Sequence, residues 1–202
     1  MLLAGDIGGT KTDLAVISPI DGPRAPLAEQ TFPSADYPGL AELVRPFVES
    51  FDWTIERAVF GVAGPVIDGR TDATNLPWSM DERTLKSDLG IPSVHLMNDL
   101  EAIAQSLPFL PAEDLRELSR GQPEAGGVRG VIAPGTGLGE AFLIEANGRF
   151  TPHPSEGGHA SFSPCTDVQC DLLAAMRKDR DHVSFERVCS GLAIPELYAF
   201  LR

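Results

Sequence analysis

The hydrophobic pattern of the first hundred residues predicts short buried strands separated by helices. Apolar runs at Leu2–Asp6 and Asp13–Ile17 predict the two strands of a hairpin, because a glycine-rich segment separates them. Ala58–Ala63 and Ser93–Met97 predict two further strands of similar length. Short strands that alternate with helical segments are typical of an α/β domain.

Helical spacing of apolar residues predicts two helices in the same region. The first has one apolar face, formed by Leu40, Leu43, Val44, Phe47 and Val48. We expect Asp36 to cap this helix with Pro38 in its first turn, and Pro46 to kink or shorten it. The second helix follows Asn98 and Asp99 and has its apolar residues at Leu100, Ile103, Ala104 and Leu107.

The second half of the chain repeats the strand pair of the first. Gly130–Ala133 and Ala141–Glu145 flank another glycine-rich tip, which suggests two related halves that face each other across a cleft. Two helices follow, with apolar residues at Leu172, Leu173 and Met176 and at Ile194, Leu197, Tyr198 and Leu201. The two prolines of Leu107–Pro111 indicate a junction, so we predict domains at residues 1–109 and 110–202.

Charge and cysteine content narrow the class of protein. The 202 residues carry a formal net charge of −13, which argues against a nucleic-acid or anionic-membrane partner. Three cysteines without a secretory leader, and no apolar run of membrane-spanning length, indicate a cytoplasmic protein with reduced thiols. Cys165 and Cys170 are spaced like half of a zinc site, but no second pair follows them.

Both glycine-rich tips are candidate phosphate sites, because missing side chains let backbone N–H groups approach an anion. The first holds Gly8, Gly9 and Thr10, and the second holds Gly135, Thr136, Gly137 and Gly139. Neither has the spacing of a Walker loop or of a dinucleotide-binding loop. A purely structural hairpin turn remains an alternative for each tip.

Acidic and polar residues beside the first tip suggest phosphoryl-transfer chemistry. Asp6 is placed to hold a magnesium ion, directly or through water, or to cap the turn. Lys11 and Thr12 are placed to reach phosphate oxygens or to lie in solvent. Asp99 is a candidate base for a hydroxyl group with Asn98 beside it, and the alternative is that this pair caps the next helix.

A further group of polar residues lies in the second half. Glu156 and His159 surround two glycines, an arrangement that suits sugar hydroxyls but also fits a metal half-site or a surface turn. Glu186 lies on a short predicted helix and by itself would be a solvated charge.

Six ordered segments together resemble the bacterial glucokinase family, which has the actin-like (ribonuclease H-like) ATPase fold of two-lobed α/β sugar kinases. The segments are Gly5–Thr10, Thr74–Trp78, Asn98–Ala102, Gly135–Gly139, Glu156–His159 and Ser184–Gly191. The resemblance implies ATP-dependent phosphorylation of glucose at its 6-hydroxyl. It also implies a homodimer as a candidate assembly.

The resemblance implies a role for each candidate residue. Asp99 would be the catalytic base, and Asn98, Glu156, His159 and Glu186 would bind the sugar together with it. Asp6 would organise Mg²⁺. ATP phosphates would bind Gly8, Gly9, Thr10, Lys11, Gly135, Thr136, Gly137 and Gly139.

The chain departs from the family pattern in three respects. Lys11 stands where relatives also have Asn, and Glu140 adds negative charge next to the second tip. The last third or so of the pattern is absent, so we expect an incomplete second lobe, an incomplete adenosine site, weak or absent kinase activity and self-association.

Two alternatives remain open. One is a non-catalytic sugar-binding or regulatory module. The other is the zinc-containing, repressor-related group of sugar kinases, although the segment from Cys165 to Cys170 lacks that group's compact cysteine pattern. The hexose and the phosphate donor, ATP or polyphosphate, also remain open.

Overall fold

The computed structural model describes residues 1–73, 76–122 and 124–202. Thr74 and Asn75 of the quoted Thr74–Trp78 segment therefore lie outside the described residues. The chain divides into two compact units, unit 1 (Met1–Ala102) and unit 2 (Ile103–Arg202). The predicted domains at 1–109 and 110–202 stay a prediction. In the described part of the chain, no helix combines the length and the apolar character needed to cross a membrane.

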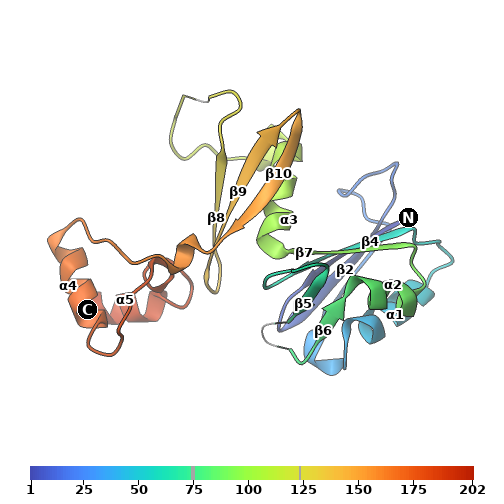
Figure 1. The fold of residues 1–202 in the computed structure, drawn as a ribbon, viewed down its shortest axis with the longest axis horizontal. Helices are drawn as coiled ribbons and strands as arrows, with labels where there is room; N and C mark the ends of the chain where they lie inside the picture. Colours follow the sequence, from blue (N-terminus) through green and yellow to red (C-terminus); the bar gives the residue numbers. More distant parts are fainter. Residues whose placement is uncertain (74–75, 123) are drawn as a thin grey trace. The chain divides into compact units, whose positions relative to one another are not determined.

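Unit 1 is built on a five-stranded sheet with the order β3-β2-β1-β4-β7 (Figure 1). Its strands are β1 (Leu2–Ile7), β2 (Lys11–Ile17), β3 (Ala28–Pro33), β4 (Arg57–Val62) and β7 (Ser93–Asn98). Strands β1, β4 and β7 run parallel to one another, β2 pairs antiparallel with β1, and β3 pairs antiparallel with β2. The four strands predicted in this half are confirmed, and β3 is an additional edge strand.

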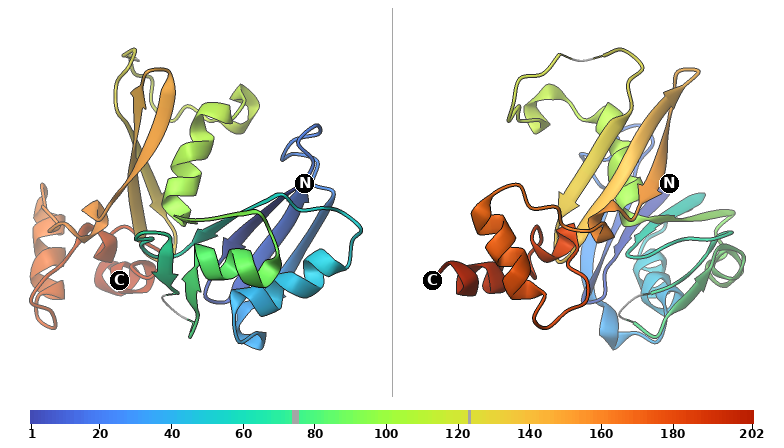
Figure 2. Two further views of the ribbon diagram at one scale, coloured as in Figure 1. Left: turned by 45° about the vertical axis from the view of Figure 1, so that its right-hand side comes forward. Right: turned by 60° about the vertical axis from the view of Figure 1, so that its left-hand side comes forward.

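Two helices pack together beside this sheet in unit 1, as Figure 2 shows. They are α1 (Leu40–Glu49) and α2 (Glu82–Leu89), and α1 buries one apolar face in the core of the unit. The prediction that Asp36 caps α1 is wrong. Asp36 ends a short 3₁₀ helix, η1 (Ser34–Asp36), and Gly39 is the N-cap of α1. Pro46 does not end α1, since the buried face continues to Phe47.

Smaller elements complete unit 1. The hairpin of β5 (Arg70–Asp72) and β6 (Ser79–Asp81) leads into α2, whose N-cap Asp81 accepts N–H bonds from Arg83 and Thr84. At the other end of α2, Gly90 has the left-handed conformation that favours glycine after a helix. Helix α3 (Asp99–Ser106) follows β7 directly and contains the division between the units.

Unit 2 contains a three-stranded antiparallel sheet with the order β10-β9-β8. The predicted strand pair is confirmed as β8 (Arg129–Pro134) and β9 (Leu138–Ala146), and β10 (Arg149–Ser155) is additional. Asn147 and Gly148, both with positive φ, form the tight turn between β9 and β10. The other elements are η2 (Leu107–Phe109), η3 (Ala112–Asp114), η4 (Gly157–His159), α4 (Asp167–Met176), η5 (Phe185–Arg187) and α5 (Ile194–Leu201).

Candidate functional site

Unit 1 places Asp6 and Asp99 at the carboxyl ends of two strands that flank β4. Asp6 of β1 pairs in register with Gly61 of β4, and Gly61 pairs with Met97 of β7. Asp99 lies two residues beyond Met97, at the start of α3. This edge of a parallel sheet is where open α/β folds bind their ligands.

Asn98 caps helix α3, as one of the two interpretations of the sequence expected. Its Oδ1 accepts hydrogen bonds from the N–H groups of Leu100 at 2.9 Å and Glu101 at 3.3 Å. In the opposite direction, the Glu101 carboxylate accepts a hydrogen bond from the Asn98 N–H at 3.1 Å. The amide group of Asn98 also donates to the Gly64 carbonyl at 3.0 Å. These bonds fix the start of α3, while sugar binding by Asn98 stays a prediction.

The carboxylate of Asp99 has a raised pKa. Burial raises its pKa above the ordinary value, the Leu100 N–H lowers it, and the charge of Asp6 raises it again. The pKa of Asp6 is raised too, by burial first and then by Asp13, with a smaller lowering by Lys11. A raised pKa brings a carboxylate closer to the range in which it can take a proton from a hydroxyl group.

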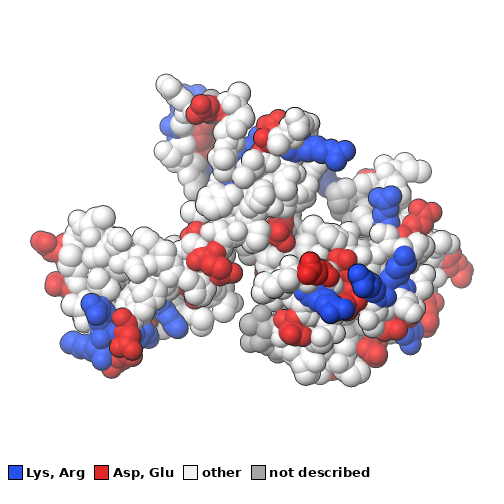
Figure 3. Space-filling view, in the orientation of Figure 1, with Lys and Arg blue, Asp and Glu red and all other residues white. Residues whose placement is uncertain are grey.

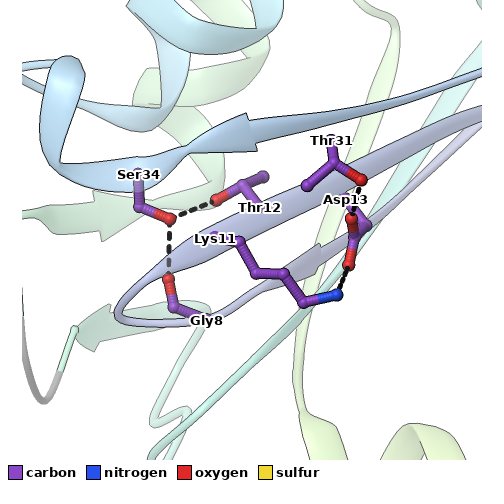
Figure 4. Close-up of polar contacts among 6 residues, drawn as sticks. All are labelled: Gly8, Lys11, Thr12, Asp13, Thr31 and Ser34. Atoms are coloured by element: carbon purple, nitrogen blue, oxygen red, sulfur yellow. Dashed lines mark hydrogen bonds and ion pairs between the residues drawn. The ribbon is translucent and has the colours of Figure 1, made fainter.

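The first tip, between β1 and β2, is held by polar contacts on two sides (Figure 4). On one side, the ammonium of Lys11 pairs with Asp13 at 2.7 Å, and the Lys11 side chain is 65% exposed. Asp13 also accepts a hydrogen bond from Thr31. On the other side, Thr12 is fully buried and its hydroxyl contacts that of Ser34 at 3.0 Å. Thr12 is therefore neither solvated nor available to phosphate, which corrects the expectation from sequence.

The second tip, between β8 and β9, is brought together with Glu186 of η5. The Glu186 carboxylate accepts a hydrogen bond from the Leu138 N–H at 3.0 Å and lies directly over Gly137. The Gly191 N–H donates to the Gly135 carbonyl at 2.8 Å. Unit 2 thus gathers the tip, Glu186 and the turn at Gly191 into one cluster.

The segment Glu156–His159 packs against the start of β9 through its two glycines. The Glu140 carboxylate lies against Gly157, and the Leu138 carbonyl lies against Gly158. Glu156 and His159 are left exposed, at 86% and 65%, with a loose contact of 3.6 Å between carboxylate and ring. Exposed polar side chains on a tightly packed backbone suit hydroxyl recognition, but this role stays a prediction.

The metal alternatives differ in how well the residues fit them. Across the described ranges, no three His, Cys, Asp or Glu side chains are grouped so that they could hold a metal ion. Cys165, Cys170 and Cys189 are free and exposed. Within those same ranges, the Asp6 carboxylate accepts no hydrogen bond, so it suits Mg²⁺, which needs only one or two carboxylates when phosphates supply other ligands.

The predicted residues therefore form two groups, one in each unit. Unit 1 holds Asp6, the first tip, Asn98 and Asp99, and unit 2 holds the second tip, Glu156, His159 and Glu186. The sequence analysis missed Ser34, which lies in η1 at the end of β3. Its signal was weak, because β3 buries only one apolar residue, Phe32.

Comparisons with known proteins identify the family to which this chain is similar. The family model described as Glucokinase matches residues 3–202. A glucokinase of Nostoc punctiforme is 39% identical over 206 residues, which cover 100% of this chain and 60% of that protein. The chain thus spans about 60% of the length of the curated relatives it matches.

Solved structures show the same fold. A glucokinase from an Antarctic psychrotroph superposes with a TM-score of 0.85 at 32% identity, over 99% of this chain and 63% of that one. A glucokinase of the ROK family from Streptomyces griseus, in complex with glucose and AMPPNP, gives 0.59 at 23% identity, over 96% and 59%. The predicted actin-like sugar kinase fold, present in part, is confirmed.

Proposed function

Because the chain belongs to the glucokinase family, we propose that it carries the sugar-binding residues of a kinase that phosphorylates glucose. In this reaction the 6-hydroxyl oxygen of glucose forms a bond to the terminal phosphorus of ATP. The bond from that phosphorus to the bridging oxygen breaks, so that ADP leaves, and the hydroxyl proton passes to a carboxylate. Glucose and a nucleotide analogue bound to the Streptomyces griseus protein support this choice of substrates.

The environment of the Asp99 carboxylate is the observation that carries the proposal. Its carboxylate is half-buried at the end of β7, and the capping bonds of Asn98 fix the backbone that carries it. Burial and the charge of Asp6 both raise its pKa. We assign to Asp99 the orientation of the 6-hydroxyl and the removal of its proton.

The remaining roles follow from the position and charge of the other residues. Asp6 would hold Mg²⁺ together with the phosphates, and the ion would neutralise charge on them. The N–H groups of the two tips would bind phosphate oxygens. The chain has a net charge of −13 and repels phosphate overall, so these N–H groups must supply the attraction at the site. Asn98, Glu156, His159 and Glu186 would bind the other sugar hydroxyls.

A non-catalytic sugar-binding module is a second candidate, and one observation favours it. The Glu186 carboxylate already accepts a hydrogen bond from the Leu138 N–H, and a phosphate at the second tip would need this N–H as a donor. A protein that keeps this contact would bind sugar without transferring phosphate. Turnover and binding must therefore be measured separately.

Calorimetric titration of the 202-residue chain with glucose tests the proposal. We expect binding that Glu156→Ala abolishes and that Glu145→Ala, an exposed control on β9, retains. Formation of glucose 6-phosphate from ATP should fall by about 10²–10⁴-fold in Asp99→Ala, if the chain turns over. Failure of the folded chain to bind glucose would contradict the proposal, and binding without any turnover would favour the module.

Location and assembly are also proposals. Three exposed thiols suit a reducing compartment such as the cytoplasm. Helix α5 exposes Ile194, Tyr198 and Leu201, which suits self-association into a homodimer. Light scattering that finds only monomers would contradict this assembly.

A further inference from the structure

Ser34 lies fully buried at the start of η1 and makes two contacts with the first tip and one with Thr12 of β2. Figure 4 draws the two contacts of its hydroxyl group. Its hydroxyl donates to the Gly8 carbonyl at 2.8 Å, and its backbone N–H donates to the Thr10 carbonyl at 3.1 Å. Since the one hydroxyl proton of Ser34 goes to Gly8, the contact with Thr12 at 3.0 Å must be donated by Thr12. A residue 26 positions away thus holds both ends of the tip.

These contacts determine where the tip directs its N–H groups. In a trans peptide, the carbonyl and the following N–H point in opposite directions, and the described chain has no cis peptide bond. Because the Gly8 carbonyl points at Ser34, the Gly9 N–H points away from it. The Gly8 N–H is bonded to the Lys11 carbonyl at 2.9 Å, whereas within the described residues the Gly9 N–H is bonded to no acceptor.

We propose that Ser34 is a positioning residue, which fixes the Gly8–Gly9 peptide so that the Gly9 N–H meets an oxygen of a bound polyphosphate chain. This inference rests on the proposed function, in which the first tip binds phosphates. Ser34 itself does not touch the ligand. It acts by holding the carbonyl side of the peptide while the N–H side stays free for the anion.

Thr12 provides the means to separate this role from a merely structural one. Ser34→Ala removes the bonds to Gly8 and to Thr12, whereas Thr12→Val removes only the bond between the two side chains. Both variants lose a buried hydrogen bond, so both should unfold at lower denaturant concentration than the parent chain. Only Ser34→Ala should release the Gly8–Gly9 peptide.

The experiment is a titration of the ¹⁵N-labelled 202-residue chain with magnesium tripolyphosphate, followed by NMR at the Gly9 amide. We expect the Gly9 signal to move in the parent chain. The apparent affinity should weaken by about tenfold or more in Ser34→Ala, as for one lost hydrogen bond to a charged group. It should stay within about threefold in Thr12→Val and in the exposed control Gln30→Ala on β3.

Each outcome decides a different point. Equal weakening by Ser34→Ala and Thr12→Val, or no weakening by Ser34→Ala, would overturn the inference and leave phosphate binding at the tip intact. A Gly9 signal that never responds in the parent chain would remove the first tip from the proposed function as well. If Ser34→Ala does not fold, Ser34→Cys carries the test, because its larger thiol leaves no cavity at the hydroxyl position and is a weaker donor.

Discussion

Replacing Asn98 by alanine tests whether this residue acts on α3 or on the ligand. The change removes three side-chain hydrogen bonds, two that cap α3 and one to the Gly64 carbonyl. Loss of a cap costs about 1 kcal/mol. Loss of the Gly64 bond costs about 1 kcal/mol more. Asn98→Ala should therefore lower the free energy of unfolding by about 2 kcal/mol.

Asn98→Ser is the matched variant, because serine is also a good N-cap but cannot reach the Gly64 carbonyl with an amide. We expect it to lose only about 1 kcal/mol. Urea unfolding followed by tryptophan fluorescence is a suitable assay, because the chain has two tryptophans, Trp53 and Trp78, and both lie in unit 1. An alanine variant as stable as the parent chain would refute the capping argument.

Glucose titration of the same variants then separates the two roles of Asn98. If Asn98 acts only by fixing α3, Asn98→Ser should bind glucose almost as well as the parent chain. If its amide binds the sugar directly, Asn98→Ser should recover stability relative to Asn98→Ala but not affinity. The proposed function predicts the second result.

Three further predictions follow from contacts in the two units. Asp99→Asn should raise the free energy of unfolding at neutral pH. Because the pKa of Asp99 is raised in the folded state, the parent chain loses stability as the pH rises from the unfolded-state pKa of Asp99 through its folded-state pKa. Urea unfolding at several pH values should show that the gain of the variant vanishes toward about pH 4. Gly158→Ala should cost about 1–3 kcal/mol in the same assay, because the new Cβ would overlap the backbone carbonyl of Leu138. Gly157→Ala should cost less, because there the overlap is with the end of a flexible Glu140 side chain, and equal costs would contradict this packing. Glu186→Gln should keep the fold and strengthen tripolyphosphate binding at the Leu138 amide, measured by NMR, since it removes the charge but not the acceptor.

The sequence predicted strands such as β4 and β7 because their buried apolar residues leave a clear pattern. The edge strands β3 and β10 were not predicted, for a physical reason. β3 buries only Phe32, and β10 contains Pro152 and Pro154, which normally argue against a strand. An edge strand needs pairing on one side only, so β10 tolerates both prolines next to β9.

Residue type and position were enough to predict which side chains lie at the ends of strands. They were not enough to predict the partners of these side chains, because those partners are distant in sequence. Ser34 and Gly8 are 26 positions apart, and Glu186 and Leu138 are 48 apart. Glu101 was within reach of sequence analysis, because it stands three residues after Asn98 as in a capping box.

The two glycine-rich tips look alike in sequence but differ in what they offer an anion. At the first tip, a neutral hydroxyl group binds the carbonyl of Gly8, so the N–H of Gly9 stays free. At the second tip, the carboxylate of Glu186 binds an N–H directly, so an incoming phosphate must displace a negative charge. Displacement is costly in a chain with a net charge of −13, unless another ligand draws Glu186 away. If Glu186 also binds the sugar, glucose should free the Leu138 N–H, and phosphate binding at the second tip should then strengthen when glucose is present.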